Sequence, residues 1–200
     1  MPVAFLNFTY LVASVLFIVG LKGLTHPRTA VRGNLLSALG MLIAVLVTVA
    51  DRQIIAYELI LAGVVIGSGL GALLALKIHM TAMPQMVALL NGFGGGASLL
   101  VAGAALIEAT AAGGVPDAQF TISAAASGVV GAVTFWGSLV AFAKLQELIS
   151  GNPVILKGRH ALNGALALLC VLLAAWLVAE PDEPLAYWSM AAAASLLGVL

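Results

Sequence analysis

An asparagine sits inside an apolar stretch of this chain, where its amide could take part in a hydrogen-bonded path. Asn91 follows Pro84 by seven residues and precedes a glycine-rich run that ends at Gly96. A primary amide that faces lipid is costly, because its hydrogen bonds are unsatisfied there. Asn91 therefore needs a partner. That partner is either a structural hydrogen bond to another helix or the neighbouring station of a path for ions or protons.

A second set of polar residues follows in the next apolar stretch. Its members recur at spacings of 4, 4, 3 and 4, which places them on one face of a helix: Ser123, Ser127, Gly131, Thr134 and Ser138. The stretch around Asn91 has a matching line of Asn91, Gly94 or Gly95, and Ser98. Two such faces, if opposed, enclose a narrow polar seam that admits water. Alternatively, the hydroxyl groups bond their own i−4 carbonyls and only allow tight packing.

The candidate proton path is the polar part of these two lines, namely Asn91, Ser98, Ser123, Ser127, Thr134 and Ser138. The acids and bases of the chain lie elsewhere. The histidines fall in connecting segments, and Glu58 and Glu108 fall near the ends of apolar runs. If the chain moves protons, we expect the titrating group to come from another chain or from sequence beyond Leu200.

The composition predicts an integral membrane protein. Only 8% of the 200 residues are charged, 62% are hydrophobic, and the mean hydropathy is +1.16, which does not allow a charged surface around a water-soluble core. The first residues lack a basic n-region and a cleavage site, so we expect the first apolar run to be a retained span. The single Cys170 provides neither a disulfide nor a metal framework, and we identify no catalytic residue and no metal ligand.

Seven apolar segments divide the chain, and most are long enough at about 1.5 Å per residue to cross a hydrocarbon core of about 30 Å. They cover residues 4–21, 35–50, 54–76, 85–107, 120–143, 161–179 and 185–200. The second is short and should borrow flanking residues, and the seventh stops in mid-run as if cut. Short connections favour a compact bundle. We therefore expect an all-α, polytopic transmembrane bundle of about six complete spans plus a cut seventh, forming one domain over 1–200 with no soluble domain.

Basic residues are concentrated in the connections after the first, third and fifth segments. These connections hold seven of the eight Lys and Arg residues: Lys22, Arg28, Arg32, Lys77, Lys144, Lys157 and Arg159. By the positive-inside rule, these loops face the cytoplasm and the N-terminus lies outside. The loop from Leu145 to His160 is either topogenic only or a docking surface for a cytoplasmic domain. We call Arg28, Arg32, Lys77, Lys144, Lys157, Arg159 and His160 the coupling-loop residues.

Glycines spaced four apart predict close helix packing. Gly63, Gly67 and Gly71 share one face of the third segment, and small residues at this spacing let helix backbones approach each other within lipid. The nearby GSGLG run does not have the G-x-G-x-x-G spacing of a dinucleotide loop. We assign the same packing role to Gly94, Gly95 and Gly131.

At these residues the sequence resembles the membrane domain of the beta subunit of proton-translocating NAD(P) transhydrogenase. The resemblance covers nearly the whole chain. It rests on FIVGLKGL in the first span, the pair Gly33-Asn34, KIHMTAMPQMVALLNGFGG from Lys77, GAVTFWGSLVAFAKL from Gly131, and RHALN from Arg159. The run from Lys77, with its M-T-x-M-P turn, is the most diagnostic of these segments.

The resemblance implies a subunit that couples proton translocation to hydride transfer between NAD(H) and NADP(H), with both nucleotides held in soluble domains outside this chain. It implies an enzyme complex in which this chain alone is not catalytic. The implied partners are an alpha-type subunit with further helices and the NAD(H) domain, the NADP(H)-binding domain, the lipid bilayer, and a dimer of the whole assembly, without nucleic acid. The implied location is the bacterial inner (cytoplasmic) membrane.

Two positions depart from the family pattern. Some members have a relay histidine where this chain has Asn91, and some have an acid where it has Ser123. These departures suggest that the relay histidine lies on a helix of the partner subunit.

Two other classes of function compete with this interpretation. A fragment of a secondary transporter should show inverted or parallel repeats, and none is evident in the 200 residues. A structural assembly subunit is the third class. Purifying the chain together with its neighbouring subunits would distinguish these interpretations. A nucleotide-binding soluble partner supports the transhydrogenase subunit, and a lone solute-binding bundle supports the transporter fragment.

Overall fold

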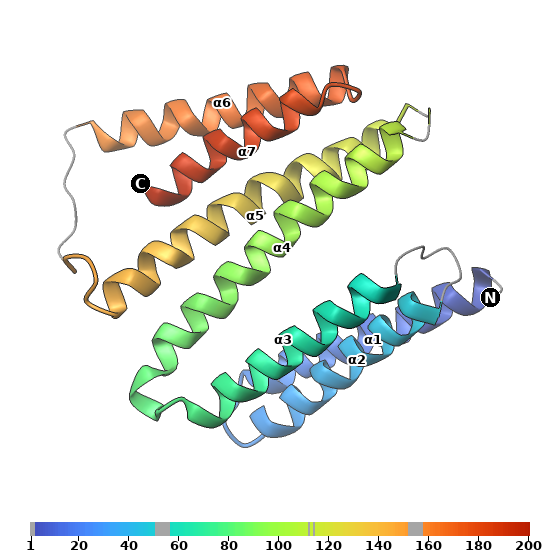
Figure 1. Ribbon diagram of the computed structural model, residues 1–200, viewed down its shortest axis with the longest axis vertical. Coiled ribbons are helices and arrows are strands. Elements are labelled where there is room, and N and C mark those ends of the chain that lie inside the picture. The colour runs from blue at the N-terminus through green and yellow to red at the C-terminus, as the bar shows by residue number, and fades with distance from the viewer. Residues whose placement is uncertain (1–2, 51–56, 112, 114, 152–157) are drawn as a thin grey trace. The chain divides into compact units, whose positions relative to one another are not determined.

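The computed structural model describes residues 3–50, 57–111, 113, 115–151 and 158–200, which form helices and no strand. The helices are α1 (Val3–Leu24), α2 (Ala30–Ala50), α3 (Tyr57–Lys77), the short 3-10 helix η1 (Met80–Ala82), α4 (Met83–Ala111), α5 (Ala118–Leu145), α6 (Arg159–Ala179) and α7 (Pro184–Val199). Six are long and apolar enough to cross a membrane, and α7 is shorter. The predicted all-α architecture is confirmed (Figure 1).

The second apolar segment does borrow residues on its N-terminal side. The helix α2 begins at Ala30, five residues before the apolar run at 35, and takes in Arg32 and Asn34. The turn before it is closed by Thr29, whose hydroxyl donates to the Gly23 carbonyl at 2.6 Å. The coupling-loop residue Lys157 lies outside the described residues.

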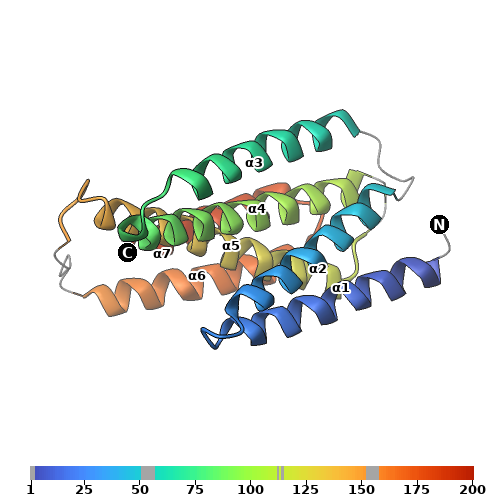
Figure 2. The ribbon, with the colours of Figure 1, turned by 90° about the horizontal axis from the view of Figure 1, so that it is seen from below.

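The chain divides into two compact units, residues 1–76 and 77–200, and the prediction of a single transmembrane domain stays a prediction. In the first unit, α1 and α2 form an antiparallel hairpin that both ribbon views show (Figures 1 and 2). Their backbones touch where Gly33 meets Gly20 and Gly23. A Cβ on Gly33 would lie 2.6 Å from the Gly20 carbonyl oxygen. Toward the other end of the hairpin, the Tyr10 and Thr48 hydroxyls hydrogen-bond at 2.8 Å.

The helix α3 differs from this hairpin because its surface is uncovered. None of its residues is buried. A Cβ on Gly63, Gly67 or Gly71 would meet nothing within 4 Å among the described residues. The helix against which these glycines are predicted to pack is therefore not among the described residues, and their packing role stays a prediction.

The second unit is built on the antiparallel pair α4 and α5, with α7 packed against α5 and α6 packed against α7 (Figure 1). Tyr187 of α7 is 1% exposed, and its ring fits against Gly103 of α4 and Gly128 of α5. Its hydroxyl donates to the Leu99 carbonyl at 2.6 Å. This bond satisfies the polar end of a buried aromatic ring. Tyr187 thus joins three helices at one point.

The two ends of the second unit have different chemistry. At the end with Lys144 and Arg159, the Gln85 side chain donates to the Leu145 carbonyl at 3.2 Å and joins the start of α4 to the end of α5. At the opposite end, Asp117 caps α5 by accepting a hydrogen bond from the Phe120 N–H at 2.8 Å. A side-chain cap satisfies a backbone donor that the helix leaves free.

The hairpin contact gives a first prediction. Gly33→Ala should destabilise the chain by about 1–3 kcal/mol, because the new methyl group has to displace backbone atoms. Gly67→Ala is the matched control, with open space around it and a gain in helix propensity of up to about 1 kcal/mol. Thermal unfolding of the purified protein in detergent compares the two. Equal melting temperatures would contradict the tight α1–α2 contact.

Candidate functional site: the contact between α4 and α5

The site is organised by a backbone contact between two glycines. A Cβ on Gly95 would lie 2.8 Å from the Gly131 carbonyl oxygen, and a Cβ on Gly131 would lie 2.7 Å from the Gly95 carbonyl oxygen. Contacts this close exclude any side chain at either position. By contrast, Gly94 faces open space among the described residues. Of the three glycines assigned to packing in this pair of helices, Gly95 and Gly131 lie at the crossing and Gly94 lies beside it.

One end of the site is a hydrogen bond between side chains of the two helices. The Asn91 amide donates through Nδ2 to the Ser138 Oγ at 2.9 Å. Ser138 is buried, whereas Asn91 is exposed on the surface of this chain. The amide has a second N–H and a carbonyl oxygen, so this bond uses only part of its capacity. Asn91 can bind another donor or acceptor from outside the chain.

The other end of the site is an open depression of about 290 Å³ between α4 and α5. Its polar lining consists of Ser98 from α4 and of Ser123 and Ser127 from α5. Ser123 donates to the Gln119 carbonyl at 2.8 Å, as expected for a hydroxyl that bonds its own helix. Among the described residues, the hydroxyl groups of Ser98, Ser127 and Thr134 make no hydrogen bond. Those three hydroxyl groups can therefore bind water or a polar group of another molecule.

Thr134 lies between the two ends of the site. Its Cβ would be 2.8 Å from a Cβ on Gly95, so the side chain packs directly on the glycine crossing. Helix geometry places Asn91 about 10 Å along α4 from Ser98, and Ser138 about 22 Å along α5 from Ser123. We call the six polar residues along this contact, Asn91, Ser98, Ser123, Ser127, Thr134 and Ser138, the polar seam.

The coupling-loop residues lie at helix ends and in turns. Arg28, Arg32, Lys77, Arg159 and His160 are exposed, and Lys144 is half-buried in the last turn of α5. In the second unit, Lys144 and Arg159 lie on the side of the Asn91–Ser138 bond, not on the side of the serine-lined depression. The part of the polar seam with the interhelical hydrogen bond is therefore the part nearer the basic loops.

Sequence reasoning missed Tyr187. The ring fills the space that Gly103 and Gly128 leave open on α4 and α5, and its hydroxyl reaches the backbone of α4. The available signal was a tyrosine in a mainly apolar helix, because a buried phenol needs a hydrogen-bond partner. The depression at Ser98 is lined by residues of α4 and α5 alone, so α7 covers a different part of the pair.

The sequence of the chain matches one protein family over almost its full length. Residues 6–200 match the family described as the NAD(P) transhydrogenase beta subunit. The chain belongs to this family. It is also 41% identical over 155 residues to two proteins named NAD(P) transhydrogenase subunit beta from Rhodospirillum rubrum, one of them from strain ATCC 11170. The match covers 76% of this chain and 33% of those relatives. The chain thus spans about a third of the length of the curated beta subunits that it matches.

Membership in the transhydrogenase beta family agrees with the membrane character of the helices. Several of the segments that carried the resemblance also supply residues to the tight contacts. FIVGLKGL supplies Gly20 and Gly23 to the α1–α2 contact. The run from Lys77 supplies Asn91 and Gly95, and the run from Gly131 supplies Thr134 and Ser138.

The glycine crossing of this beta-family chain can be tested by adding a methyl group. Gly95→Ala should separate α4 from α5, lengthen the Asn91–Ser138 contact and cost about 1–3 kcal/mol of stability. Gly94→Ala, one residue away with open space around it, is the control and should keep wild-type stability. Disulfide trapping between cysteines placed at 91 and 138 reports the separation. Equal trapping in both variants would remove the crossing as the element that sets this geometry.

Proposed function

We propose that this chain is the proton-conducting membrane subunit of a proton-translocating NAD(P) transhydrogenase. In this complex, soluble domains outside the chain transfer a hydride between NAD(H) and NADP(H), and proton passage through the helices is coupled to that transfer. The chain carries no catalytic role of its own. The observation that supports the proposal most directly is the polar seam along α4 and α5, in a chain of the transhydrogenase beta family.

The proton path runs along the side of the α4–α5 contact and not through it. The backbones touch at Gly95 and Gly131, which leaves no space for water between the helices at that level. The exposed side chain of Asn91 and the open depression at Ser98 lie on either side of this crossing. A chain of water or polar groups beside the crossing would connect them.

A further helix completes the path. Polar groups that face lipid are costly, so the exposed part of the polar seam calls for a covering helix in the assembled complex. The seam residues themselves are an amide and hydroxyl groups, which donate and accept hydrogen bonds without titrating near neutral pH. The proton-accepting group, most simply a histidine, then belongs to that helix of an alpha-type partner subunit.

The basic ends of the helices face the soluble domains. With the N-terminus outside and the coupling-loop residues in the cytoplasm, Lys144 and Arg159 lie on the membrane face where nucleotide-binding domains would dock. The complex then sits in the inner membrane of a bacterium. Because the Asn91–Ser138 bond is near this face, a movement of the docked domain has a short route to the seam.

Removing the Asn91 amide tests the path. Asn91→Leu should lower proton-coupled transhydrogenation at least tenfold while nucleotide binding by the soluble domains is kept, because the amide can no longer orient water or a partner's imidazole. Asn91→His should retain part of the activity with a changed pH profile, since histidine titrates near neutral pH. The measurement is reverse transhydrogenation against pH in the reconstituted complex.

Ser138→Ala removes only the acceptor of the interhelical hydrogen bond. It should also lower the rate of reverse transhydrogenation. Ser195→Ala is the matched control, because Ser195 bonds the Ala191 carbonyl of its own helix at 2.7 Å and lies outside the seam. Wild-type rates in Asn91→Leu over the whole pH range would leave Asn91 as a packing residue.

Cysteine crosslinking tests the docking face. In a background without Cys170, single cysteines in place of Arg28 or Leu148 should crosslink to a soluble domain of the intact complex. A cysteine in place of Asp182, at the opposite end of the second unit, should not. If the first two cysteines react freely with a soluble maleimide and never crosslink, the coupling surface lies elsewhere.

A further inference from the structure

The turn that ends α5 holds a glutamate in a backbone conformation that favours glycine. Glu147 has a φ of 57°, and among the described residues it is the only residue other than glycine with a positive φ. The other two such positions are occupied by Gly113 and Gly158. In this region the Cβ of an L-residue crowds the backbone, so a side chain lowers stability relative to glycine. Glu147 is therefore locally strained.

Hydrogen bonds at the end of α5 hold this strained conformation in place. The Leu148 N–H donates to the Ala143 carbonyl at 2.9 Å, and the Glu147 N–H donates to the Lys144 carbonyl at 3.1 Å. This is the pattern of a Schellman turn, which needs a left-handed residue at the position of Glu147. The Leu145 carbonyl accepts a hydrogen bond from a side chain of α4 at 3.2 Å. The backbone of Glu147 cannot relax without breaking the bonds of the turn.

The charge of Glu147 is also unfavourable at this place. A carboxylate at the C-terminal end of a helix lies at the negative end of the helix dipole. Glu147 is exposed, and among the described residues its carboxylate makes no hydrogen bond and no ion pair. The described part of the chain thus contains no contact that offsets the strain and the unfavourable charge. Residues that break local rules in this way are typical of functional sites.

Glu147 is the only acid in the basic connections. The connections 22–34, 77–83 and 144–160 contain seven Lys and Arg residues and three histidines, and Glu147 is their only carboxylate. Leu148 and Ile149 follow it and are 72% and 45% exposed. Exposed apolar side chains beside a charge mark a contact surface for a protein or for a membrane. The carboxylate favours a protein, because anionic headgroups at the cytoplasmic membrane surface repel it.

We propose that Glu147 pairs with a Lys or Arg side chain of the soluble domain that docks on this face, with Leu148 and Ile149 as the apolar contact beside the ion pair. This inference rests on the proposed function, which places a soluble domain at these loops. A basic face attracts an acidic surface, but attraction by basic residues alone does not fix how that surface is oriented. A single acid among them requires a cation at one place on the docked surface. Glu147 therefore sets the register of docking.

Stability and docking should respond to Glu147 with opposite signs. Glu147→Gly removes the strained side chain and the charge at the end of α5, so the melting temperature of the purified chain in detergent should rise by about 2–4 °C. Glu147→Gln removes the charge but keeps the strained side chain, and it should give a smaller rise. A melting temperature of Glu147→Gly at or below that of the wild type would remove the strain and overturn the proposal.

Docking is measured by photocrosslinking in the reconstituted complex. Leu148→Cys, in a background without Cys170, carries a benzophenone that should crosslink to a soluble domain. At low salt the yield should fall about fivefold in Glu147→Gly and Glu147→Gln, whereas Glu147→Asp should keep most of it. The difference should disappear at high salt, because exposed ion pairs are screened. Glu183→Gln, which changes an exposed acid at the opposite end of the second unit, is the matched control and should keep the full yield.

Equal yields in the wild type, Glu147→Gly and Glu147→Gln at low salt would overturn the proposal. Crosslinking to lipid in place of a soluble domain would also overturn it and would assign Leu148 and Ile149 to the membrane surface. The crosslink from a cysteine in place of Arg28 separates these results from a failure of the proposed function. If that crosslink forms and Glu147 has no effect, only the role of Glu147 is wrong. If neither position crosslinks to a soluble domain, both proposals fail.

Discussion

The contact between the Gly95 and Gly131 backbones is the constraint on which the second unit depends. Within lipid, helices gain little from hydrophobic burial and associate through close packing and hydrogen bonds. Two glycines at one crossing let α4 and α5 approach until backbone meets backbone. The approach brings Asn91 within 2.9 Å of Ser138 and leaves room for the Tyr187 ring at Gly103 and Gly128. Any residue with a side chain at the crossing would disturb both contacts.

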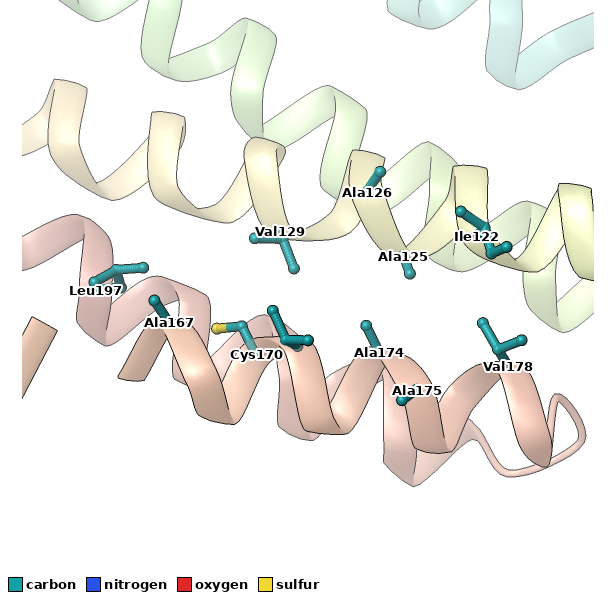
Figure 3. A pocket seen from close by; sticks show the side chains of 11 residues that line it. Ile122, Ala125, Ala126, Val129, Ala167, Cys170, Ala174, Ala175, Val178 and Leu197 are labelled. Carbon is teal, nitrogen blue, oxygen red and sulfur yellow. The ribbon is translucent and has the colours of Figure 1, made fainter. Parts of the chain in front are cut away.

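The same crossing separates two kinds of surface on the helix pair. Where Tyr187 packs on the helix pair at Gly103 and Gly128, the surface is covered, and the buried phenol donates to the Leu99 carbonyl. Along the polar seam, hydroxyl groups line a depression that belongs to α4 and α5 alone. A groove of about 650 Å³ between α5 and α6 is a third surface, with almost wholly aliphatic walls (Figure 3). The first of these surfaces is covered by a ring of the same chain, whereas the other two are open among the described residues.

The sequence predicted the helices well because apolar length and charged connections determine spans in a membrane. The spans from α3 to α6 begin or end within a few residues of the predicted apolar runs. Pro84 lies in the first turn of α4, where its missing N–H costs nothing. The periodic spacing of Ser123, Ser127, Thr134 and Ser138 also predicted a shared face, since that depends on helix geometry alone.

The partners of the small residues could not be predicted in the same way. The glycines of α3 have the same spacing as a packing motif and yet face open space among the described residues, whereas Gly95 and Gly131 meet each other. Spacing identifies a face, but tertiary contacts decide what that face meets. Tyr187 was missed for the same reason, because its role depends on glycines at positions 84 and 59 residues earlier in the chain.

Under the proposed function, the neutrality of the polar seam limits how it would couple to hydride transfer. An amide and hydroxyl groups do not gain or lose a proton near neutral pH. Proton passage along the seam would therefore be controlled by which hydrogen bonds are formed. A hydrogen bond such as that between Asn91 and Ser138 contributes a net stabilisation of only about 0.5–1.5 kcal/mol. If a soluble domain docks as proposed, a bias of that size would be enough to exchange this bond for one to water or to a partner side chain. A weak bond between two neutral groups, close to the basic loops, is therefore better suited to a switch than a buried ion pair, whose rupture would leave an uncompensated charge in the membrane.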